Sequence, residues 1–306
     1  MTTPTEPKKR RAWLAALLSL LLPGLGQLYN RQVRLAIVLM ILGVLLSMPA
    51  RWAIAAAPAG LLMPMATVIF AFGLAIPLFA IVQAVIGARR AGAIALAWFN
   101  RWFVYAGLYV LVAVLGLLAD LLPIPSVTSY SMPSGSMVPT LLVGDYSVAR
   151  TRAFEGRLPE RGEIAVFRPP SEPEVDFVKR IVGLPGDRIQ LRDGRLYLNG
   201  ALVERVPIGA MEAAPLLEDF EKAKVYRETL PGGASYLIAE FSDDGGLDNT
   251  AEFLVPADHV FVLGDNRDAS NDSRSGLGFI PLSNLHDKQL FIFWALDKSR
   301  IGTVLE

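Results

Sequence analysis

The stretch FVYAGLYVLVAVLGLLADLL, residues 103–122, decides how this chain is organised. It has the length, about 20 mostly apolar residues, that a helix needs to cross a bilayer. Long apolar runs lie before it, whereas no apolar run of 18 residues occurs from residue 124 onward. We therefore predict a membrane domain over residues 1–123 and a second, water-soluble domain over residues 124–306.

The charges divide at the same boundary. Residues 1–123 carry ten Lys or Arg and two acidic residues, a net charge of +8, and the remainder carries nineteen basic and twenty-seven acidic residues, a net charge of −8. Only 19% of the chain is charged and 53% is hydrophobic, against about 25% charged in a typical soluble domain. The composition excludes a disordered, collagen-like or coiled-coil chain.

Cysteine and histidine are scarce, with no cysteine and two histidines in 306 residues. This excludes disulfides, iron–sulfur clusters, cysteine nucleophiles and thiolate zinc sites. Two histidines are too few for most histidine-rich metal centres. We expect no metal and no cofactor.

Three further stretches lack any charge: residues 12–30, 35–50 and 52–88. Residues 60–87 are long enough to span a bilayer with tilt, and residues 35–48 are short but credible beside neighbouring helices. The first stretch is interrupted at Pro23 and Gly24. A cleaved signal peptide is the competing interpretation of the N-terminus, but no small-x-small cleavage site precedes Gln27.

Clusters of Lys and Arg predict the orientation, because such clusters favour the cytoplasmic side. They lie at residues 8–11, at 31–34 and at 89–101. Two arrangements stay open: a re-entrant hairpin over residues 12–28 with three crossings after it, or five crossings with residues 52–88 split. Both place the second domain outside. PGLGQLYN, residues 23–30, resembles small two-helix membrane hairpin modules, and it implies no activity.

The second half predicts an all-β domain, because short apolar runs alternate with Gly, Pro and Asp turns. Asp193-Gly194 and Asn199-Gly200 are hairpin-turn pairs, so residues 189–191 and 195–198 should form a β-ribbon. Residues 212–228 have a helical composition but contain Pro215, which allows one or two helical turns at most. The predicted strands are 146–149, 163–167, 177–182, 188–191, 195–198, 235–241, 259–263 and 289–295.

Four motifs concentrate residues that plain β-structure does not need: SMPSGSMVPTL (131–141), LVGDY (142–146), DFVKRIVGLPGD (176–187) and GDNRDASNDSR (264–274). Each alone allows a structural interpretation, as a linker, a strand entry, a strand with a surface lysine and a solvated turn. In the third, strand alternation points Lys179 the same way as Phe177 and Ile181. A lysine on an inward face is costly unless it is paired or neutral.

Taken together and in this order after a membrane anchor, the motifs resemble those of the type I signal peptidase family. These are membrane-bound Ser/Lys endopeptidases that remove signal peptides from exported preproteins. The resemblance implies a mostly-β catalytic domain behind a membrane anchor. The apolar segments predict that this anchor is multi-pass and α-helical and that the catalytic domain lies on the extracytoplasmic side of the cell membrane. The chain departs from the family in having more apolar segments than the usual one or two, and residues 201–250 match only its variable insert.

The resemblance implies that Ser136 is the nucleophile and Lys179 the general base. A serine hydroxyl needs a base to take its proton, and a lysine can do so only when desolvation lowers its pKa. The Ser134 hydroxyl and the Ser136 amide would hold the oxyanion, and Ser270 would hydrogen-bond the lysine. A structural role in holding the site together is implied for Arg180, Asp265, Asp272 and Arg274, the last two as an ion pair.

The same resemblance implies how a substrate binds. An extended peptide would add as a strand between residues 130–134 and residues 176–178, and shallow pockets would select small residues before the cut. The candidate pocket residues are Met132, Met137, Leu141, Phe177 and Val178. The expected partners are secreted preproteins and the lipid bilayer, with the export machinery as a further candidate and no nucleic acid.

Alternatives stay open at this stage. His259 with Asp265 or Asp268 could form a Ser/His/Asp triad around Ser136. Soluble self-cleaving repressors share part of the motifs, but they carry a DNA-binding module where this chain has apolar segments. The remaining alternatives are a specialised peptidase for one precursor and a non-enzymatic membrane scaffold, in which Ser136 and Lys179 would be replaceable.

Overall fold

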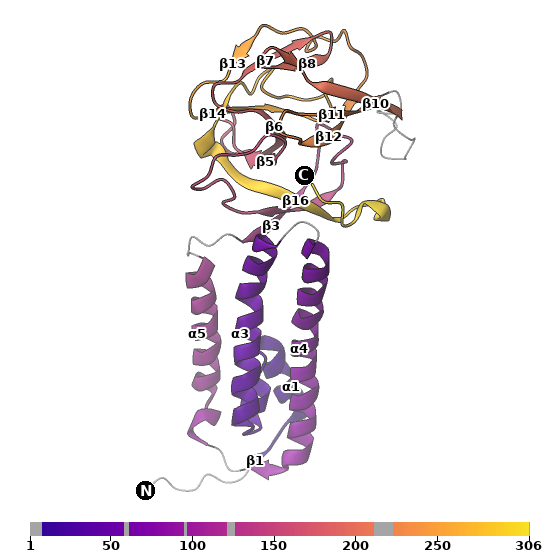
Figure 1. The fold of residues 1–306 in the computed structure, drawn as a ribbon. Helices are drawn as coiled ribbons and strands as arrows, with labels where there is room; N and C mark the ends of the chain where they lie inside the picture. The colour runs from indigo at the N-terminus through magenta and orange to yellow at the C-terminus, as the bar shows by residue number, and fades with distance from the viewer. Residues whose placement is uncertain (1–7, 58–60, 95–96, 121–125, 211–222, 306) are drawn as a thin grey trace. The chain divides into compact units, whose positions relative to one another are not determined.

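The computed structural model describes residues 8–57, 61–94, 97–120, 126–210 and 223–305. The chain forms two compact units, Met1–Ile124 and Pro125–Glu306. The first unit is built mainly from helices and the second from strands (Figure 1). The boundary that the sequence predicts, between residues 123 and 124, lies outside the described residues.

The helices of the first unit are rich in Ala and Leu, residues that favour helix formation. They are α1 (Ala12–Leu21), α2 (Leu25–Tyr29), α3 (Val33–Ala56), α4 (Leu62–Ala91) and α5 (Trp102–Asp120). A short strand pair joins β1 (Lys8–Lys9) to β2 (Ala93–Ile94), and the 3-10 turn η2 (Trp98–Asn100) precedes α5. Helices α3 and α4 run side by side in Figure 1.

One helical segment among the described residues, Pro64–Ala91, is long and apolar enough to cross a membrane. The other apolar segments are shorter than 18 residues: Ala12–Leu21, Val33–Val44 and Trp102–Leu118. The predicted multi-pass anchor is therefore not confirmed. Side chains on α4 and α5 are nevertheless turned outward, as at Phe70, which is 74% exposed, and Leu117, which is 64% exposed.

The hairpin motif at residues 23–30 has a packing explanation. Gly24 has φ +107°, in the left-handed region that favours glycine, and it lies between α1 and α2. A Cβ on Gly26 would lie 2.2 Å from the Ala15 carbonyl oxygen, so only glycine fits there. The buried Gln27 donates to the Ala80 carbonyl at 2.6 Å, which ties α2 to α4.

The second unit is built around a seven-stranded antiparallel sheet in the order β15-β14-β6-β5-β16-β4-β3. Its strands are β3 (Val127–Ser131), β4 (Tyr146–Arg150), β5 (Ile164–Phe167), β6 (Phe177–Gly183), β14 (His259–Leu263), β15 (Ile280–Pro281) and β16 (Leu285–Trp294). Two 3-10 turns, η4 (Leu282–Asn284) and η5 (Lys298–Arg300), flank β16.

Two smaller sheets complete the second unit (Figure 1). The order β13-β7-β8-β9 joins β7 (Arg188–Arg192), β8 (Arg195–Leu198), β9 (Ala201–Leu202) and β13 (Phe253–Leu254). The order β10-β11-β12 joins β10 (Glu204–Ala210), β11 (Lys224–Thr229) and β12 (Ser235–Glu240).

Every strand that the sequence predicts overlaps a strand of the structure. The predicted ribbon is β7 paired with β8, and its turn residues Asp193 and Gly194 both have positive φ. Of the predicted helical turns at 212–228, residues 212–222 lie outside the described residues, and residues 224–228 belong to β11. Strands β3, β9, β10 and β13 were not expected, because their sequences lack a clear apolar run.

The core places β6 between two apolar clusters. Ile181 packs with Phe167 and Val262 in one, and Val182 packs with Ile189 and Phe261 in the other. Neighbouring residues of a strand point to opposite faces. Strand β6 can therefore carry Lys179 toward one side and Arg180 toward the other.

Candidate active site

Two elements bring Ser136 and Lys179 together. Ser136 lies in the loop between β3 and β4, and Lys179 lies in β6. Lys179 Nζ donates to Ser136 Oγ at 2.8 Å and to the Val178 carbonyl oxygen at 3.0 Å. The residues are 43 positions apart in the chain, so the sheet and not the local sequence creates the contact.

The Lys179 ammonium lies in an apolar position. The residue is only 3% exposed, and its Nζ is 5.8 Å from the centre of the Phe177 ring. Among the described residues, Lys179 forms no ion pair with a carboxylate. Burial lowers the pKa of Lys179 to about 8, and the more distant Asp272 and Asp265 oppose the shift without cancelling it. About a tenth of the amine is therefore neutral at pH 7, and the neutral fraction grows as the pH rises.

The loop around Ser136 carries two hydrogen-bond donors that are used little or not at all within the described chain. The exposed Ser134 Oγ lies 3.3 Å from Ser136 Oγ. The Ser136 backbone N–H donates to no other group in the described part of the chain. A hydroxyl and an amide beside a nucleophile are the donors that an oxyanion hole requires.

Asn266 fixes this loop, a role that sequence analysis missed. Its backbone N–H donates to the Ser136 carbonyl at 3.2 Å, and its side-chain amide donates to the Gly135 carbonyl at 3.1 Å. Asn266 is fully buried. The only signal in the sequence was its place inside the motif at residues 264–274, where it is flanked by charged residues.

Ser270 differs from the expectation. It is buried, but its hydroxyl has no hydrogen-bond partner in the described chain, and no bond joins it to Lys179. A Cβ added at Gly264 would lie 2.2 Å from Ser270 Oγ and 2.5 Å from the Ser136 carbonyl oxygen. Ser270 therefore packs within the site close to the Ser136 backbone, because Gly264 leaves room for it.

Two buried ion pairs hold the surrounding loop. Asp265 accepts from Arg180 at 2.8 and 2.7 Å, with both side chains 1% exposed. Asp272 accepts from Arg274 at 2.9 Å, and both are fully buried. Asp265 also accepts a short hydrogen bond from Thr140, a second supporting residue that sequence analysis missed. The Arg180–Asp265 pair joins β6 to the loop that carries Ser270, and the Thr140 hydrogen bond joins that loop to the Ser136 loop. The Asp272–Arg274 pair lies within the loop that carries Ser270.

A groove of about 670 Å³ opens beside the Ser136–Lys179 pair. Its walls are residues 129–137 and 175–179, and Ala269 and Asn271 lie at its border. Strand β3 is an edge strand of the sheet. Strand β14 pairs with β6 only at residues 180–183, so no strand of the described chain pairs with residues 177–179 on that side.

Four of the predicted pocket residues line this groove: Met132, Met137, Phe177 and Val178. The prediction was wrong for Leu141, which is fully buried and packs in the core with Ile164 and Ile292. Leu141 follows the exposed part of its loop, where the chain turns back into the sheet. Met132 and Met137 also belong to that core cluster, so only part of each side chain faces the groove.

Histidine does not serve as the partner of Ser136 in the described chain. His259 Nδ1 lies 2.8 Å from the Ala257 carbonyl oxygen. Asp265 is paired with Arg180, and Asp268 accepts from the backbone of Phe241 and Ser242. The geometry thus favours the lysine over the Ser/His/Asp alternative.

No group of side chains around Ser136 in the described residues could hold a metal ion. The second unit does bring three carboxylates together elsewhere, at Glu240, Asp248 and Asp268. The chemistry available at the groove is therefore that of a hydroxyl beside a desolvated amine, which is suited to nucleophilic attack.

Comparison with known proteins finds a matching family model and similar proteins. Residues 100–294 match the family model described as signal peptidase, peptidase S26. A signal peptidase I of Rickettsia typhi is 38% identical over 192 residues, which cover 54% of this chain and 71% of the relative. One from Rickettsia felis is 37% identical over 210 residues, covering 58% and 77%. A signal peptidase I structure from Enterococcus faecalis is 25% identical, with 42% and 92% covered and a TM-score of 0.24.

Proposed function

The chain belongs to the peptidase S26 family of signal peptidases, and we propose from this premise that Ser136 is its nucleophile and Lys179 its general base. As a member of this family it is a serine endopeptidase that removes signal peptides from exported preproteins. The observation that carries the residue assignment is the 2.8 Å contact between Lys179 Nζ and Ser136 Oγ.

The proposed reaction begins with neutral Lys179. Its lone pair accepts the hydroxyl proton of Ser136, and the serine oxygen attacks the carbonyl carbon of the scissile bond. The lysine ammonium then gives this proton to the leaving amine. A water molecule, deprotonated by the same lysine, attacks the ester on Ser136, and the lysine then returns the proton to Ser136 Oγ as the acyl group leaves. Burial supports this cycle, because an amine with a pKa of about 8 can both take and return a proton near neutral pH.

The tetrahedral intermediate needs donors for its oxyanion. We assign this role to the Ser136 backbone N–H and the Ser134 hydroxyl, which lie on the same loop as the nucleophile. Loss of one such donor in other proteases lowers kcat by about 10²–10³-fold.

Ser270 is assigned to the orientation of Lys179. An ammonium group has three donors, and Lys179 uses two of them on Ser136 and Val178. The Ser270 hydroxyl is buried and has no partner in the described chain. A small rotation of either side chain, when a substrate fills the groove, would give the third donor an acceptor.

The substrate is proposed to bind as an added strand. The free edge of β3 and the unpaired side of residues 177–179 line the same groove. Backbone hydrogen bonds would supply affinity, as in other cases of β-strand addition. Met132, Met137, Phe177 and Val178 would bound shallow pockets that exclude large side chains.

We further propose that the first unit is a multi-pass anchor with the catalytic unit on the extracytoplasmic side. The exposed apolar side chains of α4 and α5 and the net charge of +8 support this arrangement. Because the chain has no cysteine, single-cysteine labelling can test it cleanly. In intact cells, an impermeant maleimide should label Glu172→Cys but not Arg90→Cys. The reverse pattern would contradict the orientation.

The residue assignment is tested with the full chain in detergent and a synthetic preprotein, with the cut site read by mass spectrometry. Ser136→Ala and Lys179→Met should each lower the cleavage rate by at least about 10³-fold, which is within the range of a lost base. Lys179→Arg should be equally inactive, since a guanidinium does not release its proton. Lys298→Met replaces an exposed lysine and is the matched control. A Lys179 variant that keeps more than a tenth of the activity while it folds normally would exclude the lysine as base.

A further inference from the structure

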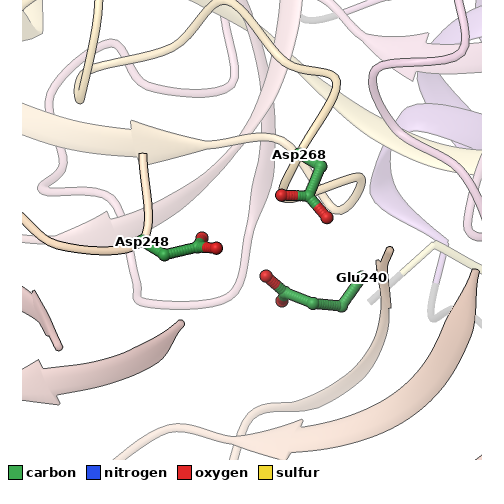
Figure 2. Close-up of side chains that lie close together, drawn as sticks. All are labelled: Glu240, Asp248 and Asp268. Atoms are coloured by element: carbon green, nitrogen blue, oxygen red, sulfur yellow. The ribbon is translucent and has the colours of Figure 1, made fainter. Parts of the chain in front are cut away.

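Three carboxylates from separate parts of the second unit converge on one point. Glu240 ends β12, Asp248 lies in the loop that follows, and Asp268 lies in the loop after β14. Figure 2 shows the three carboxylate groups directed toward one another. One oxygen of each lies within 4.8 Å of the corresponding oxygens of the other two.

The carboxylates are held in a similar way, each by one oxygen. Asp268 Oδ2 accepts from the backbone N–H groups of Phe241 and Ser242, at 2.6 and 3.1 Å. Asp248 Oδ2 accepts from the Gly245 N–H at 2.6 Å. Glu240 Oε2 accepts from Arg205 at 3.4 Å. These bonds fix the orientation of the groups and leave the second oxygens for another partner.

The second oxygens of the two most buried groups lack a partner. Glu240 is 1% exposed and Asp248 is 0% exposed, and neither Glu240 Oε1 nor Asp248 Oδ1 accepts a hydrogen bond in the described chain. A buried acceptor without a partner costs free energy, and a buried unpaired charge costs more. The carboxylate groups that carry these two atoms are directed toward one another (Figure 2), which indicates that something binds between them.

The surrounding arginines do not supply the missing partner. Arg267 pairs with Glu228 and Arg274 pairs with Asp272, both in buried pairs. Arg267 Nε and Arg274 Nη1 have no hydrogen-bond partner in the described chain, so they donate to none of the three carboxylates. Arg205 divides its guanidinium between Glu240 and Asp243. Burial and the neighbouring Asp268 and Asp248 consequently raise the pKa of Glu240 to about 8, although Arg267 and Arg205 oppose the shift. The pKa of Asp248 is also raised, mainly by burial.

We propose that Glu240, Asp248 and Asp268 bind one calcium ion. Carboxylate oxygens are the ligands that hard divalent cations prefer, and calcium bonds to them at about 2.3–2.6 Å. The three ligand oxygens lie within 4.8 Å of one another, so one ion with bonds of this length can reach all three. Magnesium demands near-ideal octahedral geometry and usually keeps several of its waters, so it fits a set made of protein carboxylates less well than calcium does.

The proposed ion has a structural consequence for the active site. It joins the end of β12 to the loop at residues 264–274, and Asp268 lies two residues before Ser270 in that loop. The ion is not part of the peptidase chemistry, which uses only the groups at the groove. The proposal departs from the sequence-based expectation of no metal, because these three acids are not close in any recognisable ligand spacing.

The test uses the full chain in detergent after treatment with a chelator. Calorimetric titration with calcium chloride should show one ion per chain, and calcium should raise the melting temperature over the same concentration range. Magnesium should bind at least about tenfold more weakly, because its geometry is stricter. Glu240→Gln and Asp248→Asn should each weaken calcium binding by at least about tenfold, since loss of a residue that merely orients a ligand already costs that much.

Asp244→Asn is the matched control, because it removes one carboxylate from the same loop at an exposed position outside the cluster. It should bind calcium with unchanged affinity. The calcium-dependent rise in melting temperature is compared with each variant's own calcium-free value, so a variant of altered stability still gives an answer.

Two results would overturn the proposal. The absence of both binding heat and a melting shift at about 10 mM calcium, above the weakest extracellular sites, would mean that a shared proton holds the cluster. Glu240→Gln, which resembles the protonated acid, would then raise the melting temperature without calcium. Unchanged calcium binding in both Glu240→Gln and Asp248→Asn would place the ion elsewhere.

Discussion

The two faces of β6 treat two neighbouring cations in opposite ways. Lys179 is 3% exposed and Arg180 is 1% exposed. On one face, Arg180 is paired with Asp265, donates to the Gly162 carbonyl at 2.6 Å and lies over the Tyr236 ring. On the other face, Lys179 has a hydroxyl and a carbonyl oxygen as its hydrogen-bond acceptors. Burial is the same, but the partners differ.

The difference teaches that burial by itself does not decide what a basic side chain does. A buried cation beside a carboxylate stays charged and contributes structure, whereas one without a carboxylate partner becomes easier to deprotonate. The chemistry of the two groups reinforces the contrast. A guanidinium group stays protonated in proteins and cannot act as a base, while an amine can. Because neighbouring residues of a strand point to opposite faces, the adjacent residues Lys179 and Arg180 serve these two roles on opposite sides of the sheet.

The largest effect on stability should come from the face of β6 that carries Arg180. Arg180→Met removes the partner of a fully buried Asp265 and should lower the free energy of unfolding by about 3–5 kcal/mol. Urea titration, followed by tryptophan fluorescence, measures this change. The matched control is Arg188→Met, which breaks the exposed pair between Arg188 and Glu252 and should cost about 0–1 kcal/mol. Equal losses in the two variants would remove the distinction between the faces.

A smaller, graded effect should come from the Lys179 face as the pH changes. The cleavage rate should rise about tenfold per pH unit below the pKa of Lys179, and level off above it, because only the neutral amine accepts the Ser136 proton. The midpoint should lie close to the lowered pKa of about 8. Single-turnover cleavage over a pH series checks this profile. A rate that is constant from acid to mildly alkaline pH would contradict a lysine base.

The same shift has a defined sign in stability. The pKa of Lys179 is lowered in the folded protein from 10.5 to about 8, so between these values the unfolded chain binds more protons than the folded one. The contribution of Lys179 to the free energy of unfolding should therefore rise with pH in this window and be flat below it. The difference between wild type and Lys179→Met isolates this contribution, and a decrease with pH would contradict the assignment.

Much of the second unit could be predicted because its signals are local. Short apolar runs between turn residues identified strands such as β6 and β14, and Asp193-Gly194 identified the β7–β8 turn. The membrane unit was harder, since length and hydropathy indicate apolar helices without fixing how many of them cross a bilayer. Leu141 was misassigned because a residue that follows an exposed loop can still turn inward.

The sequence by itself determined the strand periodicity, the turn residues, the charge asymmetry and the motifs that hold Ser136 and Lys179. These depend on neighbouring residues along the chain. Only the tertiary structure decided that Lys179 would have no carboxylate partner among the described residues, that Asn266 would hold the Ser136 loop, and that Glu240, Asp248 and Asp268 would meet. The burial of a side chain and the meeting of distant residues depend on which strands pack together. The local sequence around each residue does not determine that packing.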